Sequence, residues 1–262
     1  MSSQVIHQNT WDGLRQFTAA RIALGRTGNS LPTKELLKFG LAHAQARDAV
    51  HLPFNADGLS DELQSLGFNT LQAHSAATDR ETYLRRPDLG RQLNTESRDQ
   101  LRQRASPVDL VIVVGDGLSS TAIHRNTIPF LQELRPRLEI LGITLGPIVL
   151  THQARVAIGD DIASALQAKA VAVLIGERPG LSSPDSLGIY LTWQPQVGLL
   201  DSERNCISNV RPEGLTYPEA AHKLSWLLNE AFRRQLSGVN LKDESDNAED
   251  FLLQQKTSTT LK

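Results

Sequence analysis

Two glycine-containing loops carry the residues best suited to bind a ligand, and the first of them is Gly115-Asp116-Gly117. It follows the apolar stretch LVIVV at 110–114 and precedes two serines. The dinucleotide fingerprint G-x-G-x-x-G needs a third glycine so that the backbone can approach a pyrophosphate, but position 120 is Ser120. The phosphate loop G-x-x-x-x-G-K-S/T does not occur in the sequence either. These glycines therefore predict either a ligand-binding loop or only a tight turn between a strand and a helix.

The second loop, GERPG at 176–180, places Glu177 and Arg178 just past another apolar run. A carboxylate can accept two N–H groups at once, and each such hydrogen bond is charge-assisted. One interpretation is therefore that Glu177 binds a ligand rich in amide donors. The alternative is that Glu177 and Arg178 only form a salt bridge at the edge of a sheet.

Cys206 is the only cysteine in the sequence, so a disulfide within the chain is excluded. A free cysteine is most often a small buried apolar residue, and a nucleophilic one would need a nearby base. No local motif connects any of the seven histidines to Cys206. His43 and His51, with Asp48 between them, could share a metal only on one uninterrupted helix, and solvated histidines are commoner there. We therefore predict that this chain contributes no catalytic residue and no metal site.

Short apolar runs alternate with helical patterns from Pro107 onward. We expect strands at 108–114, 138–145, 170–175 and 187–193, and helices at 119–134, 160–169 and 218–236. This alternation predicts an α/β fold of the Rossmann-like, doubly wound kind, with a parallel sheet and right-handed crossovers. Ligands bind such sheets at the carboxyl ends of the strands, so both glycine-containing loops should face one crevice.

The rest of the chain divides by composition. Residues 1–106 are predicted to be mostly helical and to serve in subunit docking, with Trp11 and Phe17 as exposed anchors in a polar segment. Residues 107–240 form the predicted α/β ligand-binding domain. Residues 241–262 begin with a charged stretch and are predicted to be a disordered tail.

Charge and hydropathy narrow the functional classes. The formal net charge of −2 gives no overall attraction to nucleic acid or to an anionic membrane. No apolar run approaches the roughly 18–20 residues that span a bilayer. The polar N-terminus has no apolar signal core, so we expect a cytoplasmic protein without a nucleic-acid or membrane partner.

Several stretches occur in an order that resembles the small subunit of ethanolamine ammonia-lyase, an adenosylcobalamin-dependent enzyme. They are RIALGRTG at 21–28, LPTKELL at 31–37, AHAQARDAV at 42–50, YLRRPDLGR at 83–91, VGDGLSSTAI at 114–123, IGERPGL at 175–181 and NCISN at 205–209. The resemblance runs from about residue 15 to residue 240, and the strings YLRRPDLGR and GERPGL are its most specific parts.

The resemblance implies a cofactor held between this chain and a larger barrel subunit, which carries the substrate. The cofactor contacts of the family carry over to Val156, Glu177 and Cys206, where an apolar side chain, a carboxylate and a neutral thiol would meet the amide-bearing rim of a corrin. We add Asp116 and Arg178 from their positions in the two loops. The motif D-x-H-x-x-G, which supplies a protein histidine to cobalt, is missing from the sequence. The cofactor's own benzimidazole is therefore expected to stay on cobalt, without a ligand from this chain.

The implied reaction is radical. Homolysis of the cobalt–carbon bond starts the conversion of ethanolamine to acetaldehyde and ammonia, so this chain should be a subunit of a carbon–nitrogen lyase that is inactive alone. The resemblance also implies a hetero-oligomer of two-subunit pairs. Some family members are placed in a bacterial microcompartment by a longer N-terminal extension. Because this chain begins close to its first family motif, we expect no such targeting through its own N-terminus.

Two other functions compete with this interpretation. A stand-alone nucleotide-binding oxidoreductase would need a glycine at position 120 and a local acid–base pair, and the sequence offers neither. A non-enzymatic interaction protein is favoured by the arginine-rich turn at 83–91 and by the charged tail.

Overall fold

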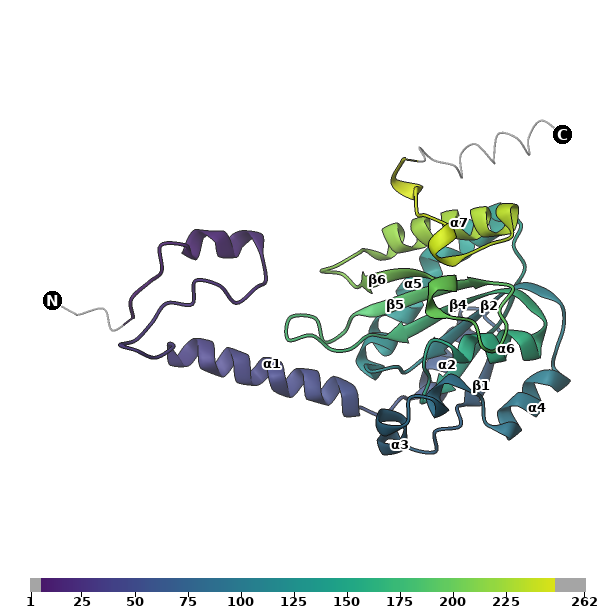
Figure 1. Cartoon of the computed structure of the whole chain (residues 1–262), viewed down its shortest axis with the longest axis horizontal. Coiled ribbons are helices and arrows are strands. Elements are labelled where there is room, and N and C mark those ends of the chain that lie inside the picture. Colours follow the sequence, from purple (N-terminus) through teal and green to yellow (C-terminus); the bar gives the residue numbers. More distant parts are fainter. Residues whose placement is uncertain (1–5, 248–262) are drawn as a thin grey trace.

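A six-stranded mixed sheet forms the centre of the protein, and helices cover both of its faces (Figure 1). The structure is a computed structural model that describes residues 6–247. The strand order is β1-β3-β2-β4-β5-β6. The strands are β1 (Thr70–His74), β2 (Val108–Gly115), β3 (Leu145–His152), β4 (Ala168–Gly176), β5 (Leu187–Trp193) and β6 (Asn205–Val210). Neighbours among β1, β3, β2 and β4 pair in parallel, whereas β5 and β6 are antiparallel.

The α/β class is therefore confirmed, but the expectation of a parallel sheet is wrong for the strands after β4. A parallel return needs a crossover of roughly a dozen residues or more, usually through a helix. Only residues 177–186 join β4 to β5, so the chain returns antiparallel. The loop that contains Glu177 consequently lies at the carboxyl edge of the sheet and connects two neighbouring strands.

Seven α-helices occur within residues 6–247, and most of them cover the two faces of the sheet. They are α1 (Thr33–His51), α2 (Ala56–Ser65), α3 (Arg80–Arg85), α4 (Thr95–Gln103), α5 (Ser120–Leu141), α6 (Ile158–Leu166) and α7 (Tyr217–Arg234). Side chains of α2, α5 and α7 share one core with Leu110, Ile112 and Val114 of β2. Side chains of α4 and α6 share the other core with Val111 and Val113. Because both faces of β2 are buried from Leu110 onward, its sequence is continuously apolar there.

The predicted strands at 108–114, 170–175 and 187–193 are confirmed, whereas the one at 138–145 is wrong. Helix α5 continues past Pro136 as far as Leu141, and Leu138 is buried on its core side. The helix ends at Gly142, whose left-handed φ of 67° is typical of helix C-termini. The next strand therefore begins only at Leu145.

The ends of the two later helices also differ from prediction. Helix α6 ends at Leu166 because Gln167 adopts a left-handed φ of 60°, so Lys169 belongs to β4 instead of the last helical turn. Helix α7 ends at Arg234, because Gln235 already adopts a left-handed φ of 58°, whereas Gly238, the predicted end, begins the short 3-10 helix that follows.

The sequence patterns did not indicate strands β1 and β6, which are the two edges of the sheet. Edge strands are partly exposed, so their sequences, TLQAH and NCISNV, lack the apolar runs of the central strands. Strand β1 lies within the region predicted to be mostly helical. The division of the chain at residue 106 stays a prediction, although the sheet extends across it.

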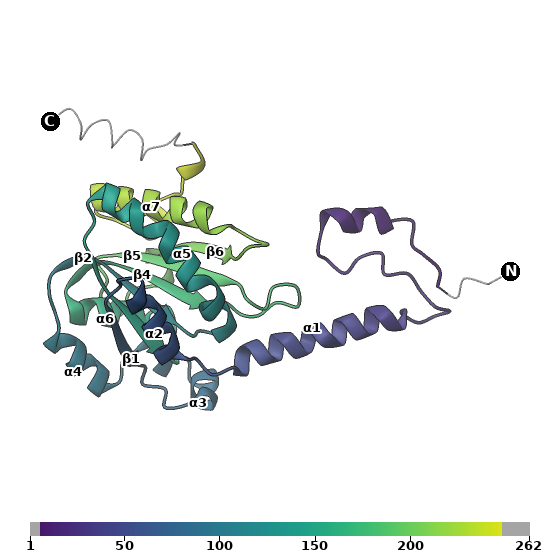
Figure 2. The same cartoon turned by 180° about the vertical axis from the view of Figure 1, so that it is seen from behind.

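An N-terminal arm, residues 6–52, projects from the sheet-containing body (Figures 1 and 2). It consists of a short 3-10 helix, Asp12–Phe17, an extended segment and α1. Only Ala42 and Ala49 of α1 are buried. Ten of the fifteen large apolar side chains exposed within residues 6–247 lie on this arm. Among them are Trp11 and Phe17, which are 66% and 80% exposed.

The segment that follows α7 packs back onto that helix. Leu241 is buried, and Lys223 on α7 forms ion pairs with Asp243 and Asp246 at 3.3 and 2.7 Å. Residues 241–247 are thus ordered, although they were predicted to be part of a disordered tail. The rest of that predicted tail, 248–262, lies outside the described residues. None of the helices within 6–247 has the length and apolar character needed to cross a membrane.

His124 on α5 makes the stability of the fold sensitive to pH. Its Nε2 accepts a hydrogen bond of 3.2 Å from the backbone N–H of Asn55, the N-cap of α2, and so requires neutral imidazole. Burial lowers the pKa of His124 below its ordinary 6.5, although nearby Glu62 acts in the opposite direction. A histidine whose pKa is lower in the folded state stabilises the fold above its unfolded pKa, and this stability is lost as the pH falls.

We therefore expect the melting temperature to decrease between pH 7.5 and pH 5.5, and to decrease less in His124→Gln. Differential scanning calorimetry across this range measures both changes. His152, whose pKa is also lowered by burial, should account for part of the remaining decrease. Equal decreases in the wild type and the variant would contradict the role given to His124.

Candidate functional site

The candidate site lies at the switch point of the sheet, outside the carboxyl ends of β2 and β4. The chain passes from β2 to β3 on one side and then crosses back to β4 on the other side. A crevice at such a reversal of strand order is where open α/β sheets bind ligands. Here it contains a pocket of about 440 Å³. The pocket is lined by Tyr83, Gly117, Leu118, Arg155, Val156, Ile175, Gly176, Glu177, Arg178 and Tyr190.

The floor of the pocket is formed by direct backbone contact between the two glycine-containing loops. Gly117 has a left-handed φ of 55°, and a Cβ there would lie 2.3 Å from the carbonyl oxygen of Gly176. A Cβ on Gly176 would lie 2.1 Å from the carbonyl oxygen of Ser119. Leu118 donates its N–H to the Gly176 carbonyl at 2.8 Å. Glycine is thus required here so that one loop can pack on the other.

Asp116 belongs to the first of these loops, but its side chain is buried and does not line the pocket. Its buried carboxylate accepts the backbone N–H groups of Gln153 at 3.1 Å and of Ala154 at 2.9 Å. Desolvation raises the pKa of Asp116, and the hydrogen bonds to these two amides oppose the increase. Asp116 therefore fastens the loop after β2 to the loop after β3, which carries Val156. Its predicted contact with the cofactor stays a prediction.

The loop that carries Val156 is also held from the other side, by the turn at 83–91. The hydroxyl of Tyr83 donates to the carbonyl of Ala154 at 3.0 Å, and the N–H of Arg155 donates to the carbonyl of Gly90 at 2.8 Å. A Cβ on Gly90 would lie 2.8 Å from Cγ of Arg155, so only glycine permits this approach. The structured turn predicted from YLRRPDLGR therefore positions Val156.

Glu177 is half-buried and lines the pocket. Its carboxylate accepts a short hydrogen bond from the hydroxyl of Ser186 and lies 3.4 Å from the N–H of Asn209. Within the described residues no ion pair joins Glu177 to Arg178, so the salt-bridge interpretation is wrong. A carboxylate has about four acceptor sites, and these neighbours leave some of them free for donors in the pocket.

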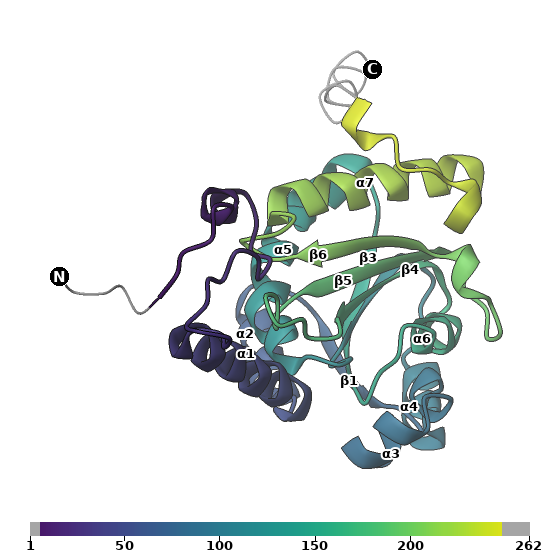
Figure 3. The same cartoon turned by 60° about the vertical axis from the view of Figure 1, so that its left-hand side comes forward.

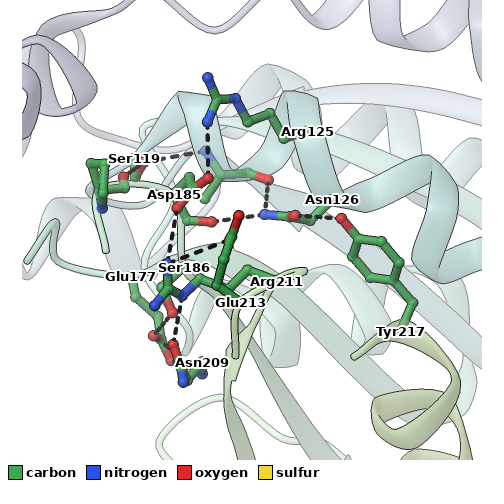
Figure 4. Close-up of polar contacts among 12 residues, drawn as sticks. Ser119, Arg125, Asn126, Glu177, Asp185, Ser186, Asn209, Arg211, Glu213 and Tyr217 are labelled. Carbon is green, nitrogen blue, oxygen red and sulfur yellow. Dashed lines mark hydrogen bonds and ion pairs between the residues drawn. The ribbon is translucent and has the colours of Figure 1, made fainter. Parts of the chain in front are cut away.

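A polar network around Asp185 fixes the end of the Glu177 loop (Figure 4). The Asp185 carboxylate pairs with Arg125 at 2.9 Å and with Arg211 at 3.8 Å. The Asp185 carbonyl accepts from Asn126 at 2.8 Å, and Asn126 in turn accepts from the hydroxyl of Tyr217 at 2.9 Å. These contacts join the loop to α5, to the segment after β6 and to α7. They thereby fix the adjacent Ser186, which orients Glu177.

Arg178 and Cys206 complete the set of predicted contacts. Arg178 is exposed and lines the pocket. Cys206 is exposed on β6 and pairs with Tyr190 of the neighbouring strand β5. Desolvation raises the pKa of Cys206, which keeps the thiol neutral. Cys206 thus does not line the pocket itself but neighbours Tyr190, which does.

Comparison with known proteins identifies the family. The model of the family described as "Ethanolamine ammonia-lyase light chain (EutC)" matches residues 8–242. The ethanolamine ammonia-lyase small subunit of Pseudomonas aeruginosa (strain LESB58) is 58% identical over 243 residues, which cover 91% of this chain and 89% of that protein. The chain belongs to the ethanolamine ammonia-lyase light-chain family. The protein of that name from Pseudomonas fluorescens (strain Pf0-1) is 60% identical over 242 residues, which cover 91% of this chain and 88% of that protein.

Membership of the ethanolamine ammonia-lyase light-chain family confirms the resemblance seen in the sequence and makes the chain a lyase subunit. The match covers the arm as well as the sheet, because it begins at residue 8. Both interpretations without a lyase, the stand-alone oxidoreductase and the non-enzymatic interaction protein, are therefore wrong.

Three further polar side chains that line the pocket in this light-chain fold were missed in the sequence: Tyr83, Arg155 and Tyr190. Tyr190 is surrounded by apolar residues of β5, so its sequence position indicates only a strand. Tyr83 comes from a part of the chain far from the two loops. Arg155 directly precedes Val156, and this position was the one signal that could have indicated its role.

Proposed function

We propose that this chain holds adenosylcobalamin at its interface with the large subunit of ethanolamine ammonia-lyase, which converts ethanolamine to acetaldehyde and ammonia. The observation that carries this proposal is that Val156, Glu177 and Arg178, from two separate loops, line one pocket at the switch point of the sheet. When bound, the cofactor supplies the radical chemistry of the reaction. The residues of this chain bind and orient the corrin, and none of them acts on the substrate.

The lining of the pocket suits the rim of a corrin. The unused acceptor sites of Glu177 can take carboxamide N–H groups in charge-assisted hydrogen bonds. Val156 and Tyr190 provide apolar contact, and the neutral thiol of Cys206 can lie against the ring without a desolvated charge. Arg178 can donate to oxygen acceptors of the cofactor. Among the described residues no histidine lines the pocket, and we propose that cobalt keeps the cofactor's own benzimidazole.

The pocket also favours a site shared with another chain. Its volume of about 440 Å³ falls in the range that encloses a drug-sized ligand, and a corrin with its nucleotide tail is larger. A second surface must therefore cover the rest of the cofactor. We propose that the large subunit does so and that the apolar side chains of the arm dock on it. The assembled enzyme would be a hetero-oligomer of such pairs, either free in the cytoplasm or within a bacterial microcompartment.

The proposal is tested by mixing the purified chain with adenosylcobalamin and the large subunit. Co-elution of both chains with the colour of the corrin, and release of ammonia from ethanolamine only by the mixture, are expected. Ammonia release by this chain alone would refute the division of roles. A mixture that retains no corrin would refute the cofactor site.

Replacing Glu177 with alanine should weaken the retention of adenosylcobalamin by about 1–3 kcal/mol, because carboxamide donors are then left without an acceptor. Equilibrium dialysis of the assembled complex measures the change in Kd. Glu213→Gln is the matched control, since Glu213 belongs to the same polar network and is exposed, and it does not line the pocket. Similar Kd values for the two variants would argue against a contact at Glu177.

A further inference from the structure

Arg80 on α3 joins three segments that meet behind the pocket. Its Nε donates to the carbonyl of Val50 at 2.9 Å. Its Nη1 donates to the carbonyl of Gly117 at 2.8 Å and to Oε1 of Gln153 at 3.4 Å. The same Nη1 lies 3.5 Å from the carboxylate of Asp116. With its side chain only 20% exposed, Arg80 is held in this position by contacts on several sides.

The acceptors of Arg80 belong to different parts of the fold. Val50 is in the last turn of α1, at the base of the arm, and α3 lies directly beside this end of α1 (Figures 1 and 3). Gly117 is in the loop that forms the pocket floor, and Gln153 begins the loop that carries Val156. Two nitrogens of the guanidinium serve these acceptors: Nε faces Val50 and Nη1 faces the other three, whereas the buried Nη2 has no hydrogen-bond partner among the described residues. A lysine ammonium carries its three donors on one nitrogen, so it cannot reach both sets of acceptors from the same position.

Arg80 also reaches the wall of the pocket through an aromatic ring. Its guanidinium carbon lies 4.8 Å from the ring centroid of Tyr83, and that of Arg155 lies 4.3 Å from the same centroid. Tyr83 and Arg155 line the pocket, whereas Arg80 does not. Displacement of Arg80 would therefore release Tyr83, Gly117 and the Gln153 loop at the same time.

We propose that Arg80 is a positioning residue. It fixes the loop with Gly117 and the loop that begins at Gln153 to the base of the arm, and it thereby sets the affinity for adenosylcobalamin. This inference rests on the proposed function. It also connects the surface proposed to dock on the large subunit with the pocket, because the end of α1 and the floor of the pocket share one side chain. Arg80 acts through Gly117, Gln153 and Tyr83 and makes no contact of its own with the cofactor.

The test compares Arg80→Met and Arg80→Lys in the complex with the large subunit. For Arg80→Met we expect the Kd of adenosylcobalamin, measured by equilibrium dialysis, to rise about ten- to a hundredfold, as the loss of charge-assisted hydrogen bonds implies. Arg80→Lys should fall between this variant and the wild type. At saturating cofactor kcat should be unchanged, so that only the KM for the cofactor rises. Hydrogen exchange should become faster at the amides of Gln153 and Ala154.

Arg135→Met is the matched control. The Arg135 guanidinium donates to the carbonyls of Leu66 at 2.7 Å and Gly67 at 3.2 Å and lies 4.5 Å from the ring of Phe68, so it repeats the chemistry of Arg80 away from the pocket. This variant should retain the wild-type Kd.

Equal Kd values for Arg80→Met and Arg135→Met would overturn the role of Arg80 while leaving the proposed function intact. If Arg80→Met does not fold, Arg80→Lys decides, because wild-type affinity in that variant would overturn the inference. A wild-type complex that binds no adenosylcobalamin would instead refute the proposed function, and the inference with it.

Discussion

Replacing Arg204 with methionine is expected to destabilise the fold by about 3–5 kcal/mol, because it leaves a buried carboxylate without its partner. Arg204 precedes β6 and forms two hydrogen bonds of 2.7 Å with the carboxylate of Asp160 in α6. The two side chains are only 1% and 2% exposed. Arg204 also donates to the hydroxyl of Thr192 in β5 at 3.1 Å and to the carbonyl of Leu199 at 3.2 Å, so it joins α6 to β5 and to the segment that follows β5.

The pH dependence of this variant identifies the cause of its instability. Burial already raises the pKa of Asp160 above its ordinary 3.8, and Arg204 opposes this increase. Without Arg204 the pKa should rise further in the folded state only. A carboxyl group whose pKa is higher in the folded state binds a proton on folding, so the folded state gains stability as the pH falls towards 3.8. The difference in the free energy of unfolding between Arg204→Met and the wild type should therefore become smaller as the pH falls.

Urea denaturation at pH 7.5 and pH 5 measures this difference. The double variant Asp160→Asn, Arg204→Met is the control, because it removes the charge together with its partner and should recover part of the lost stability. A difference that is independent of pH, or a double variant less stable than Arg204→Met, would show that lost packing rather than an unpaired charge is responsible.

The ion pair between Asp160 and Arg204 also helps to position the candidate site, because it joins the elements that carry two of the proposed cofactor contacts. Asp160 lies in the first turn of α6, just after the loop with Val156, and Arg204 lies two residues before Cys206. Neighbouring Asp161 pairs with Arg98 at 2.6 Å and so joins α6 to α4 as well. The first turn of α6 is therefore anchored from both sides. These ion pairs therefore also restrict the movement of the loop with Val156, which precedes α6.

How much of this arrangement the sequence could predict depends on where each contact lies. Strands β2, β4 and β5 are mostly buried and mostly apolar, so their positions follow from composition. The edge strand β6, which carries Cys206, has no such pattern. The choice of Glu177 rested on the chemistry of a carboxylate in a loop and on the family resemblance, and that carboxylate lines a pocket in the structure.

Asp116 and Arg80 show why the remaining parts could not be predicted. Asp116 sits between two glycines, which suggested a ligand contact, but its partners Gln153 and Ala154 come from a loop that only the strand order brings near. Arg80 belongs to a short helix without an apolar pattern, and its acceptors lie at residues 50, 117 and 153. Contacts over such separations are set by topology and leave no local periodicity.

The contact between the glycine-containing loops leads to the second large effect. In Gly176→Ala, the new Cβ would lie 2.1 Å from the carbonyl oxygen of Ser119 and 2.7 Å from that of Asp116. Both atoms belong to the backbone of the segment between β2 and α5, so neither can rotate away as a side-chain atom could. The loops must separate instead, which we expect to cost about 1–3 kcal/mol or more, as overpacking of a core usually does. Because the same contact forms the pocket floor, the affinity for adenosylcobalamin should fall as well.

Calorimetry of the free chain and equilibrium dialysis of the assembled complex measure these two effects. Gly142→Ala separates steric overlap from backbone strain, because Gly142 has a left-handed φ of 67° but no atom within 4 Å of the position of its Cβ. Gly176→Ala carries the opposite combination, a severe overlap without a left-handed φ. Gly142→Ala should lose some stability through strain and keep the wild-type affinity for the cofactor. If Gly176→Ala also kept that affinity, the packing of one loop on the other would not shape the site.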